Sequence, residues 1–425
     1  MTTSAGDHPL RHAPFRWLVT GTTVNLLGSG IAPVALAFAV LDLGGGASEL
    51  GLVVGLYALA DVAAVLFGGV LGDRLPRTVM MQGSSAAAAV VQGLVAASLI
   101  GGWSSIPLLA GLGMVNGALS ALGGPSSSAI TQQTVPAGLL QRAISWRRIA
   151  QNVALILGNG VAGLLVVWVG SGWALAFDAL TFALAAVLFS QVRVAPVAAS
   201  TTSAEQAGLW SEVAAGFHEV MRHTWLWLLI LQALLYHLFY GGAQGVLGPI
   251  VVSDSLGRPA WGWALSTMML GFVVGGLVTL RWRPRHALFV GTCFLALTAA
   301  FPFAMAWSDS LAVVLLGAAL HGFGLEIFSV GWDLSIQEQV DPDKLARVYS
   351  FDMIGSFIAR PVGLVLTGPL AALVGSRTWL TVVGAVIVGS VLVALTSTDV
   401  RRLERKDPTA DPEGLPVDQA AATGP

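Results

Sequence analysis

The chain has 425 residues, of which 55% are hydrophobic and only 10% are charged, and its mean hydropathy is +0.77. Soluble proteins carry about 25% charged residues, so the composition excludes an ordinary soluble domain and favours a polytopic membrane protein. The net charge of −2 offers no basic surface for nucleic acid, and the single cysteine, Cys293, excludes an intrachain disulfide and a cysteine-based metal site.

Apolar runs recur along the whole chain, and each has the ~20 residues needed to cross a bilayer. Glycines, prolines and charged residues separate them, and the alternating pattern of a barrel strand is absent. The sequence therefore predicts twelve transmembrane helices, over residues 15–41, 48–72, 78–101, 104–133, 141–169, 172–192, 225–252, 260–280, 286–306, 310–338, 345–374 and 377–396.

The basic residues indicate how these helices are oriented. If both termini are cytoplasmic, all of the 21 Lys and Arg residues fall in cytoplasmic segments except Arg258 and Arg377 in outer loops and Arg360 inside a helix. This asymmetry is what the positive-inside rule predicts. We therefore expect a multi-pass protein with both termini in the cytoplasm.

The second half of the chain repeats the first. Residues 131–165 align with 336–370 at a constant offset, which pairs Gln132 with Gln337 and Gly158 with Gly363. The pattern predicts an all-α fold of two parallel six-helix repeats, an architecture of secondary transporters that bind substrate between the halves. The expected segments are a cytoplasmic tail (1–14), a first half (15–192), a cytoplasmic linker with an amphipathic helix (193–224), a second half (225–396) and a disordered cytoplasmic tail (397–425).

The stretch GVLGDRLPR (69–77) resembles the loop between helices 2 and 3 of the major facilitator superfamily. Its matching positions include Gly69, Asp73, Arg74 and Arg77, which the resemblance makes candidate gating residues. WDLSIQEQVDPDKLARVYSFDMIGSF (332–357) and RPVGLVLTGPLA (360–371) look like the enterobactin-exporter-like branch, common among bacterial exporters. The resemblance implies a monomer of the bacterial cytoplasmic membrane that exports a small organic molecule, such as a drug, siderophore or secondary metabolite, in exchange for protons.

Two features of many drug/proton antiporters are missing. Where they have a Gly-Pro pair in helix 5 this chain has Gly158-Asn159, and it lacks their arginine in helix 4, near Gly113. Two alternatives therefore stay open: an importer or symporter of a small metabolite, and a membrane sensor that transports nothing. No phosphate-binding loop, metal-ligand cluster or nucleophile–base arrangement is evident, so we expect no enzymatic activity, no cofactor and no metal.

Three ionisable residues lie deep inside predicted helices, where a charge costs roughly 2.5–3.5 kcal/mol on translocon scales. Asp61 lies in the second helix, Glu326 in the tenth and Arg360 in the eleventh. Each carboxylate could carry protons or serve as the structural partner of a nearby donor. The resemblance places helices 2 and 11 side by side, which predicts an Asp61–Arg360 ion pair between the halves. Arg360 could instead pair with Glu326 or bind an anionic substrate group.

Asp178 in the sixth helix lies within FDALTF (177–182), which resembles a packing segment of the branch, and we expect a structural role for it. Polar side chains also follow helical spacing on the helices that line the cavity in this superfamily. They could contact substrate or form hydrogen bonds between helices, worth about 0.6 kcal/mol each. The candidate substrate contacts are Asn25, Asn116, Gln232, Tyr236, Tyr240 and Gln244.

The Asp73 carboxylate is a candidate latch between the halves. The resemblance places it against the start of helix 11 when the inner gate is shut, where the helix dipole favours a carboxylate by roughly 0.3–1 kcal/mol. Alternatively, the charges of this loop only fix topology. We expect Asp73→Asn, which keeps both arginines, to insert normally into the membrane and to lose transport. Normal transport by this variant would leave only the topological role.

Overall fold

The computed structural model describes residues 8–72, 76–194, 217–341 and 344–405. Within these ranges the chain is helical and contains no strand, and the predicted twelve-helix fold is confirmed. The first half consists of α1 (Ala13–Asp42), α2 (Ala47–Gly72), α3 (Arg77–Ile100), α4 (Ile106–Thr134), α5 (Leu140–Val169) and α6 (Ser171–Ser190). Eleven described spans are long and apolar enough to cross a membrane, and the apolar part of α4, Ile106–Leu122, is shorter.

Two crossings of the second half are interrupted. The first runs through α8 (Thr224–Gly242), a π-helical turn η3 (Ala243–Leu247) and α9 (Gly248–Leu256). Pro249 follows the turn and has no N–H to donate, which accounts for the irregular backbone before it. A 3-10 turn η4 (Ala296–Ala299) likewise separates α11 (Ala287–Leu295) from α12 (Ala300–Trp307). The remaining helices are α10 (Arg258–Arg281), α13 (Leu311–Gln339), α14 (Leu345–Val374) and α15 (Ser376–Thr396).

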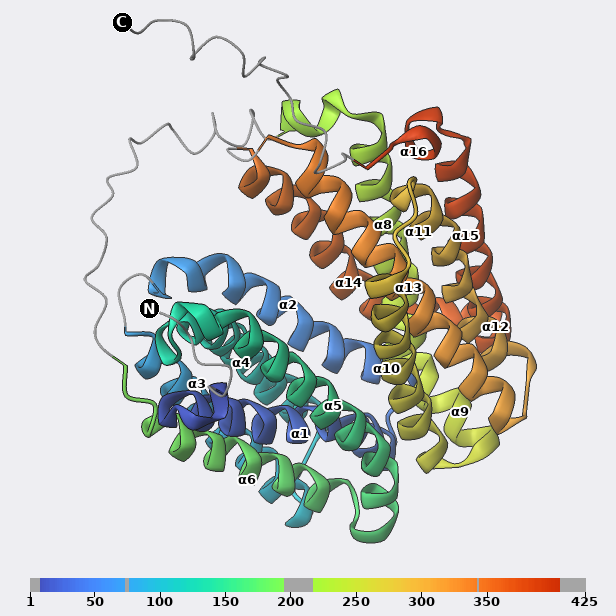
Figure 1. Ribbon diagram of the computed structural model, residues 1–425. Coiled ribbons are helices and arrows are strands. Elements are labelled where there is room, and N and C mark those ends of the chain that lie inside the picture. Colours follow the sequence, from blue (N-terminus) through green and yellow to red (C-terminus); the bar gives the residue numbers. More distant parts are fainter. Residues whose placement is uncertain (1–7, 73–75, 195–216, 342–343, 406–425) are drawn as a thin grey trace, which may run out of the picture.

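The helix bounds reproduce the internal repeat. The ranges of α4 and α13 differ by the same offset as those of α5 and α14, which is also the offset of the sequence alignment. Figure 1 shows the two six-helix halves as separate bundles that meet along two pairs of helices, α2 with α14 and α5 with α10. We call the end that carries residues 43–46 and 257 the loop end, and the end that carries residues 8–12 and 397–405 the terminal end. The halves converge toward the loop end and diverge toward the terminal end (Figure 1).

Glycines set the distance between the halves. A Cβ atom on Gly163 of α5 would lie 2.6 Å from the carbonyl oxygen of Arg258, and one on Gly368 of α14 would lie 2.5 Å from the backbone nitrogen of Ser48. Helices can approach this closely only where a side chain is absent, which is how small residues permit helix association in a membrane. The two contacts are repeats of one another.

An ion pair joins the halves at the loop end. Asp42 at the end of α1 binds Arg258 at the start of α10 through both guanidinium NH₂ groups, at 2.5 and 3.3 Å, and the Asp42 carboxylate also accepts from Ser171 at 3.0 Å. Phe38 lies under the guanidinium, 4.9 Å from it. Because both charged side chains are about two-fifths exposed, the pair contributes at most about 1 kcal/mol. It therefore orients the loop end more than it stabilises it.

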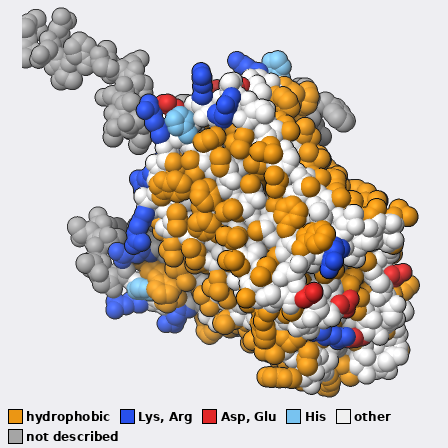
Figure 2. Space-filling view, turned by 90° about the vertical axis from the view of Figure 1, so that its right-hand side faces the viewer, with side chains coloured by type: hydrophobic (Ala, Val, Ile, Leu, Met, Phe, Trp, Pro, Cys, Tyr) orange, Lys and Arg blue, Asp and Glu red, His pale blue; other side chains and the backbone are white. Residues whose placement is uncertain are grey.

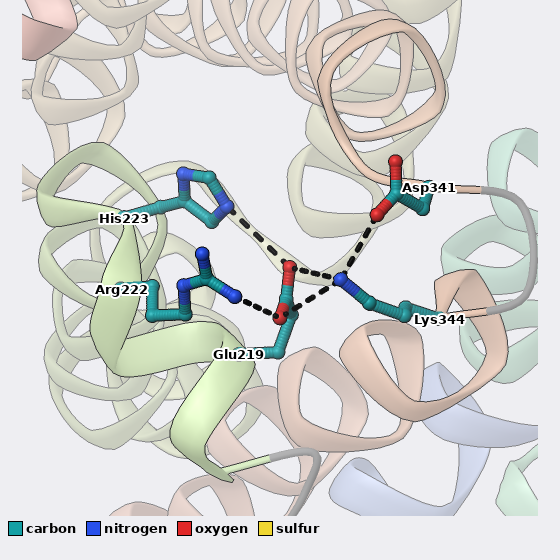
Figure 3. A network of polar contacts seen from close by, with 5 residues as sticks. All are labelled: Glu219, Arg222, His223, Asp341 and Lys344. Carbon is teal, nitrogen blue, oxygen red and sulfur yellow. Dashed lines mark hydrogen bonds and ion pairs between the residues drawn. The ribbon is translucent and has the colours of Figure 1, made fainter.

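At the terminal end, a helical segment at residues 217–222 contacts the residues that precede α14 through a network of charged side chains (Figure 3). Its buried Glu219 carboxylate lies 3.3 Å from the Lys344 ammonium and also approaches Arg222 and His223, at 3.7 and 3.6 Å. Lys344 in turn lies 2.9 Å from Asp341. These hydrogen bonds, chiefly that to Asp341, raise the pKa of Lys344 above its ordinary value.

The outer surface is apolar around its middle. Figure 2 shows hydrophobic side chains over most of one face, with basic side chains gathered toward the terminal end. Large exposed apolar side chains include Leu277, Leu280 and Leu316, which are 57–69% exposed, and we call the exposed apolar surface that they belong to the apolar belt. An exposed apolar surface of this extent is expected where lipid replaces water.

We predict that the interface glycines do not tolerate even one added carbon. Gly163→Ala or Gly368→Ala should lower the free energy of unfolding by about 1–3 kcal/mol, because the new methyl group meets backbone that cannot move aside. Gly83→Ala and Gly93→Ala in α3 are matched controls, since nothing lies within 4 Å of their added Cβ atoms. The controls should be neutral or slightly stabilising. Equal melting temperatures for all four variants in detergent would contradict the role assigned to the interface glycines.

Candidate functional site

Arg360 of α14 lies where the two halves meet. Its aliphatic stem crosses α8 at Gly241, where an added Cβ atom would lie 3.1 Å from its Cγ. The guanidinium acts electrostatically on Tyr57 and Asp61 of α2 from the first half. It also acts on Tyr236 and Tyr240 of α8 from the second half. Arg360 is thus the charged centre of this part of the interface.

The predicted Asp61–Arg360 pair remains a prediction. Asp61 is half-buried and Arg360 is exposed, and the two side chains interact electrostatically. Among the described residues, however, no hydrogen bond or ion pair joins them. A half-buried carboxylate without a bonded cation keeps its full capacity to bind a proton or a cationic ligand.

A second group of charges lies across the halves between α5 and α13. Glu326 of α13 is half-buried and packs on α10 at Gly275, where an added Cβ atom would lie 2.9 Å from its Cβ. The opposing charge is Arg148 of α5, which acts electrostatically on both Glu326 and Asp333. In the described ranges, no ion pair joins Arg148 to either carboxylate. The predicted alternative, Arg360 with Glu326, also finds no bond among these residues.

A buried histidine cluster lies in the second half and was not anticipated from the sequence. The Nδ1 atom of His321 lies 2.8 Å from the carbonyl oxygen of Thr298, so it must carry the proton. Its Nε2 atom therefore accepts the hydroxyl proton of Tyr236, at 2.9 Å. Tyr240 stacks on the imidazole with ring centroids 4.3 Å apart, and its hydroxyl donates to the sulfur of Met268 at 3.7 Å.

The internal repeat could have revealed His321. Extending the alignment into α4 and α13 places Asn116 at the equivalent position, and each is followed by a glycine, Gly117 or Gly322. A Cβ atom on either glycine would meet the same backbone contact, at Tyr57 or at Met268. His321 and Asn116 are thus equivalent positions with different chemistry.

Asn116 belongs to a polar network of the first half. Its side-chain amide donates to Gln92 at 2.9 Å, and Gln92 in turn reaches the carboxyl group of Asp178. Asp178 is fully buried, and its Oδ2 atom has no hydrogen-bond partner. The network joins α4, α3 and α6, which agrees with the structural role that we expect for Asp178.

The other candidate substrate contacts occupy varied environments. Tyr236 and Tyr240 are buried, with their hydroxyls engaged as described, and Gln232 is buried and donates to Ser390 at 3.4 Å. Asn25 is half-buried and lies within 3.5 Å of the Ser29 hydroxyl, while Gln244 contacts the sulfur of Met268 at 3.9 Å. A contact with substrate therefore remains a prediction for all of these residues, Asn116 included.

The gating candidates lie at the terminal end or outside the described residues. Asp73 and Arg74 fall outside them, Gly69 belongs to the last turns of α2, and Arg77 is the first residue of α3 and is exposed. Within the part of the chain that the structure describes, no group of three His, Cys, Asp or Glu side chains lies close enough to hold a metal ion.

Comparison with known families identifies the fold. The family model of the Major Facilitator Superfamily matches residues 18–249 and 229–422. The chain belongs to the major facilitator superfamily. It is therefore a membrane transporter of small molecules and not an enzyme.

Two similar proteins in this superfamily are efflux pumps. Macrolide efflux protein A of Streptococcus pyogenes is 23% identical over 92% of this chain and 98% of its own length. Multidrug efflux pump Tap of Mycobacterium tuberculosis is 26% identical over 91% of this chain and 94% of its own length. Both relatives therefore match this chain across both halves.

Solved structures of the superfamily share the fold at low sequence identity. The nucleoside transporter NupG aligns with a TM-score of 0.71 and 12% identity, over 90% of this chain and 98% of its own. A bacterial homologue of the human lysosomal transporter Spinster, in an inward-facing conformation, aligns with a TM-score of 0.68 and 16% identity, over 95% and 100%. These likenesses establish the fold alone.

We predict that the His321 cluster acts as one unit. Tyr236→Phe should lower the free energy of unfolding by about 1–3 kcal/mol, because it leaves the buried His321 Nε2 without a donor. His321→Phe should do the same by leaving the Tyr236 hydroxyl unpaired. The double variant should cost less than the sum of the two, by at least about 0.5 kcal/mol. Denaturation of the purified variants measures this coupling, and additive losses would show that the two residues are independent.

Proposed function

We propose that the protein is a proton-coupled exporter of small organic compounds that works by alternating access. The observation that carries the proposal is the position of two carboxylates, Asp61 and Glu326, for which the described residues show no hydrogen bond or ion pair. They lie on opposite halves near the seam, the interface of α2 with α14 and of α5 with α10. Relatives that export macrolides and other drugs and match both halves support export as the direction. Membership of the enterobactin-exporter-like branch remains a prediction from residues 332–371.

The proposed proton carriers are Asp61 and Glu326. Each is half-buried, so its carboxylate is partly desolvated while protons can still reach it. Each also feels the charge of an arginine of another helix, Arg360 or Arg148, and no bond to that arginine occurs among the residues that the structure describes. Moving the two halves would change these separations, and with them the relative free energies of the protonated and ionised forms. Such a change is what coupling between proton binding and closure requires.

The proposed substrate is an amphiphilic organic molecule that binds between the halves. The candidate polar contacts lie beside aromatic rings, since Tyr236 stacks on Tyr240 with centroids 5.1 Å apart. Aromatic faces bind apolar groups and cations without demanding one shape. The first relative's name specifies macrolides and the second's specifies multiple drugs, which supports an organic substrate.

The proposed orientation places the terminal end in the cytoplasm, as the basic residues predict. The halves diverge at that end (Figure 1), so the conformation would then be inward-facing, which is ready to accept substrate from the cell. An importer in this conformation would be releasing its substrate, and the assay below separates the two directions.

We predict that export depends on both carboxylates and on the proton gradient. In proteoliposomes with an imposed gradient, Asp61→Asn and Glu326→Gln should each lower gradient-driven drug transport at least tenfold, because the neutral side chains cannot release a proton. A protonophore should do the same to the unchanged protein. Asp309→Asn, an exposed carboxylate at the loop end, is the matched control and should transport normally.

Separate experiments test the direction of transport and its coupling to protons. A deletion strain that becomes hypersensitive to drugs supports export, while one that fails to grow on a nutrient supports import. Transport that continues after the proton gradient collapses would rule out proton coupling. A purified protein that moves no tested compound, in a strain without either phenotype, would favour the sensor.

A further inference from the structure

A pocket opens at the terminal end of the second half, away from the seam. Its volume is about 330 Å³, and it lies between the end of α10 and the start of α11, with α13 behind them. Apolar side chains form much of its wall and two arginines contribute to its lining. The side chains that matter most are Trp282, Arg283, Ile327, Val330, Leu334 and Arg405.

One of these arginines is free to bind an anion. Arg283 is exposed, and within the described ranges it makes no hydrogen bond or ion pair. Arg405 is held in place, because its backbone N–H donates to the carbonyl oxygen of Arg285 at 3.0 Å and its guanidinium lies 3.4 Å from Glu338. Arg405 therefore brings a second guanidinium to the pocket from the C-terminal segment. Two guanidinium groups beside an apolar wall suit a phosphate attached to an apolar body.

The pocket lies at the edge of the apolar belt. Leu280, one turn before its lining residue Pro284, is 69% exposed, and Val330 in its wall is 37% exposed. Trp282 is 43% exposed and packs edge-on against Phe294. A half-exposed tryptophan between apolar and basic surfaces is typical of the headgroup level of a membrane. A ligand in this pocket would thus have its polar part among arginines and its apolar part in the bilayer.

We propose that this pocket is a binding site for an anionic phospholipid. The Arg283 and Arg405 guanidinium groups bind the phosphate, and the glycerol and the first part of an acyl chain lie against Ile327, Val330 and Leu334. Basic pockets between transmembrane helices are known to suit anionic headgroups. A soluble anion would use the arginines alone, and would leave the apolar wall and the opening toward the belt without a role.

Native mass spectrometry of the full-length protein in detergent tests the proposal, with phosphatidylglycerol as the probe and phosphatidylcholine as the comparison lipid. We expect preferential binding of phosphatidylglycerol. Arg283→Gln should weaken it about tenfold, as expected for one lost charge-assisted hydrogen bond. Arg402→Gln is the matched control, because it removes the same charge from the same end of the molecule but does not line the pocket.

A second variant separates a lipid site from a surface effect of charge. Val330→Phe keeps every charge and fills the apolar part of the pocket, and should also weaken phosphatidylglycerol binding about tenfold. Equal losses in Arg283→Gln and Arg402→Gln, with none in Val330→Phe, would overturn the proposal in favour of diffuse electrostatic attraction. Displacement of the lipid by millimolar inorganic phosphate, with Val330→Phe unaffected, would overturn it in favour of a soluble anion. The readout is binding, so it does not depend on whether the protein exports drugs.

Discussion

The fold depends on direct backbone contact between its two halves. In a bilayer no hydrophobic effect holds two helices together, so close packing must do so. Gly163 lets α5 rest on the start of α10, and Gly368 lets α14 rest on the start of α2. Gly51 and Gly262 repeat the arrangement from the other side, each facing a backbone carbonyl oxygen of the opposite half. Because these contacts are made by backbone atoms, the helices have little room to slide past one another. Rotation of one half against the other about the seam is therefore favoured.

The position of this seam explains where the charges proposed to carry function lie. The close contacts use residues 156–163 of α5 and 361–368 of α14, which are the portions of these helices toward the loop end. Arg148 lies about two turns beyond this portion of α5, and Arg360 lies at its edge on α14. Both arginines therefore fall where the halves begin to separate. Arg360 acts on Asp61 and Arg148 on Glu326 across the seam, with no bond between them in the described ranges. Water between the diverging halves can solvate these charges, which lowers the free-energy cost of placing them at membrane depth.

Much of this arrangement was predictable, for physical reasons. The bilayer thickness sets helix length, so the twelve crossings follow from apolar runs, and the constant offset predicts two equivalent halves. The π-helical turn at Ala243–Leu247 and the 3-10 turn at Ala296–Ala299 were not predictable, because hydropathy reports burial and not backbone pitch. The tautomer of His321 could not be predicted either, since it depends on the carbonyl oxygen of Thr298, which lies 23 residues away in the chain.

The places where the repeat fails are the most informative about mechanism. Gly117 contacts the backbone of Tyr57 and Asp61, and its repeat equivalent Gly322 contacts that of Met268 and Phe272, so Tyr57 corresponds to Met268 and Asp61 to Phe272. The constant offset of the sequence alignment also pairs Asn116 with His321 and Asp178 with Val383. The first half therefore has Asp61 and Asp178 where the second half has apolar side chains, and it has an asparagine where the second half has the histidine of the buried cluster. Duplication alone would have left matching chemistry in both halves. The scaffold has kept its two-fold contacts while its polar groups have diverged, so the two halves present different side chains to the space between them.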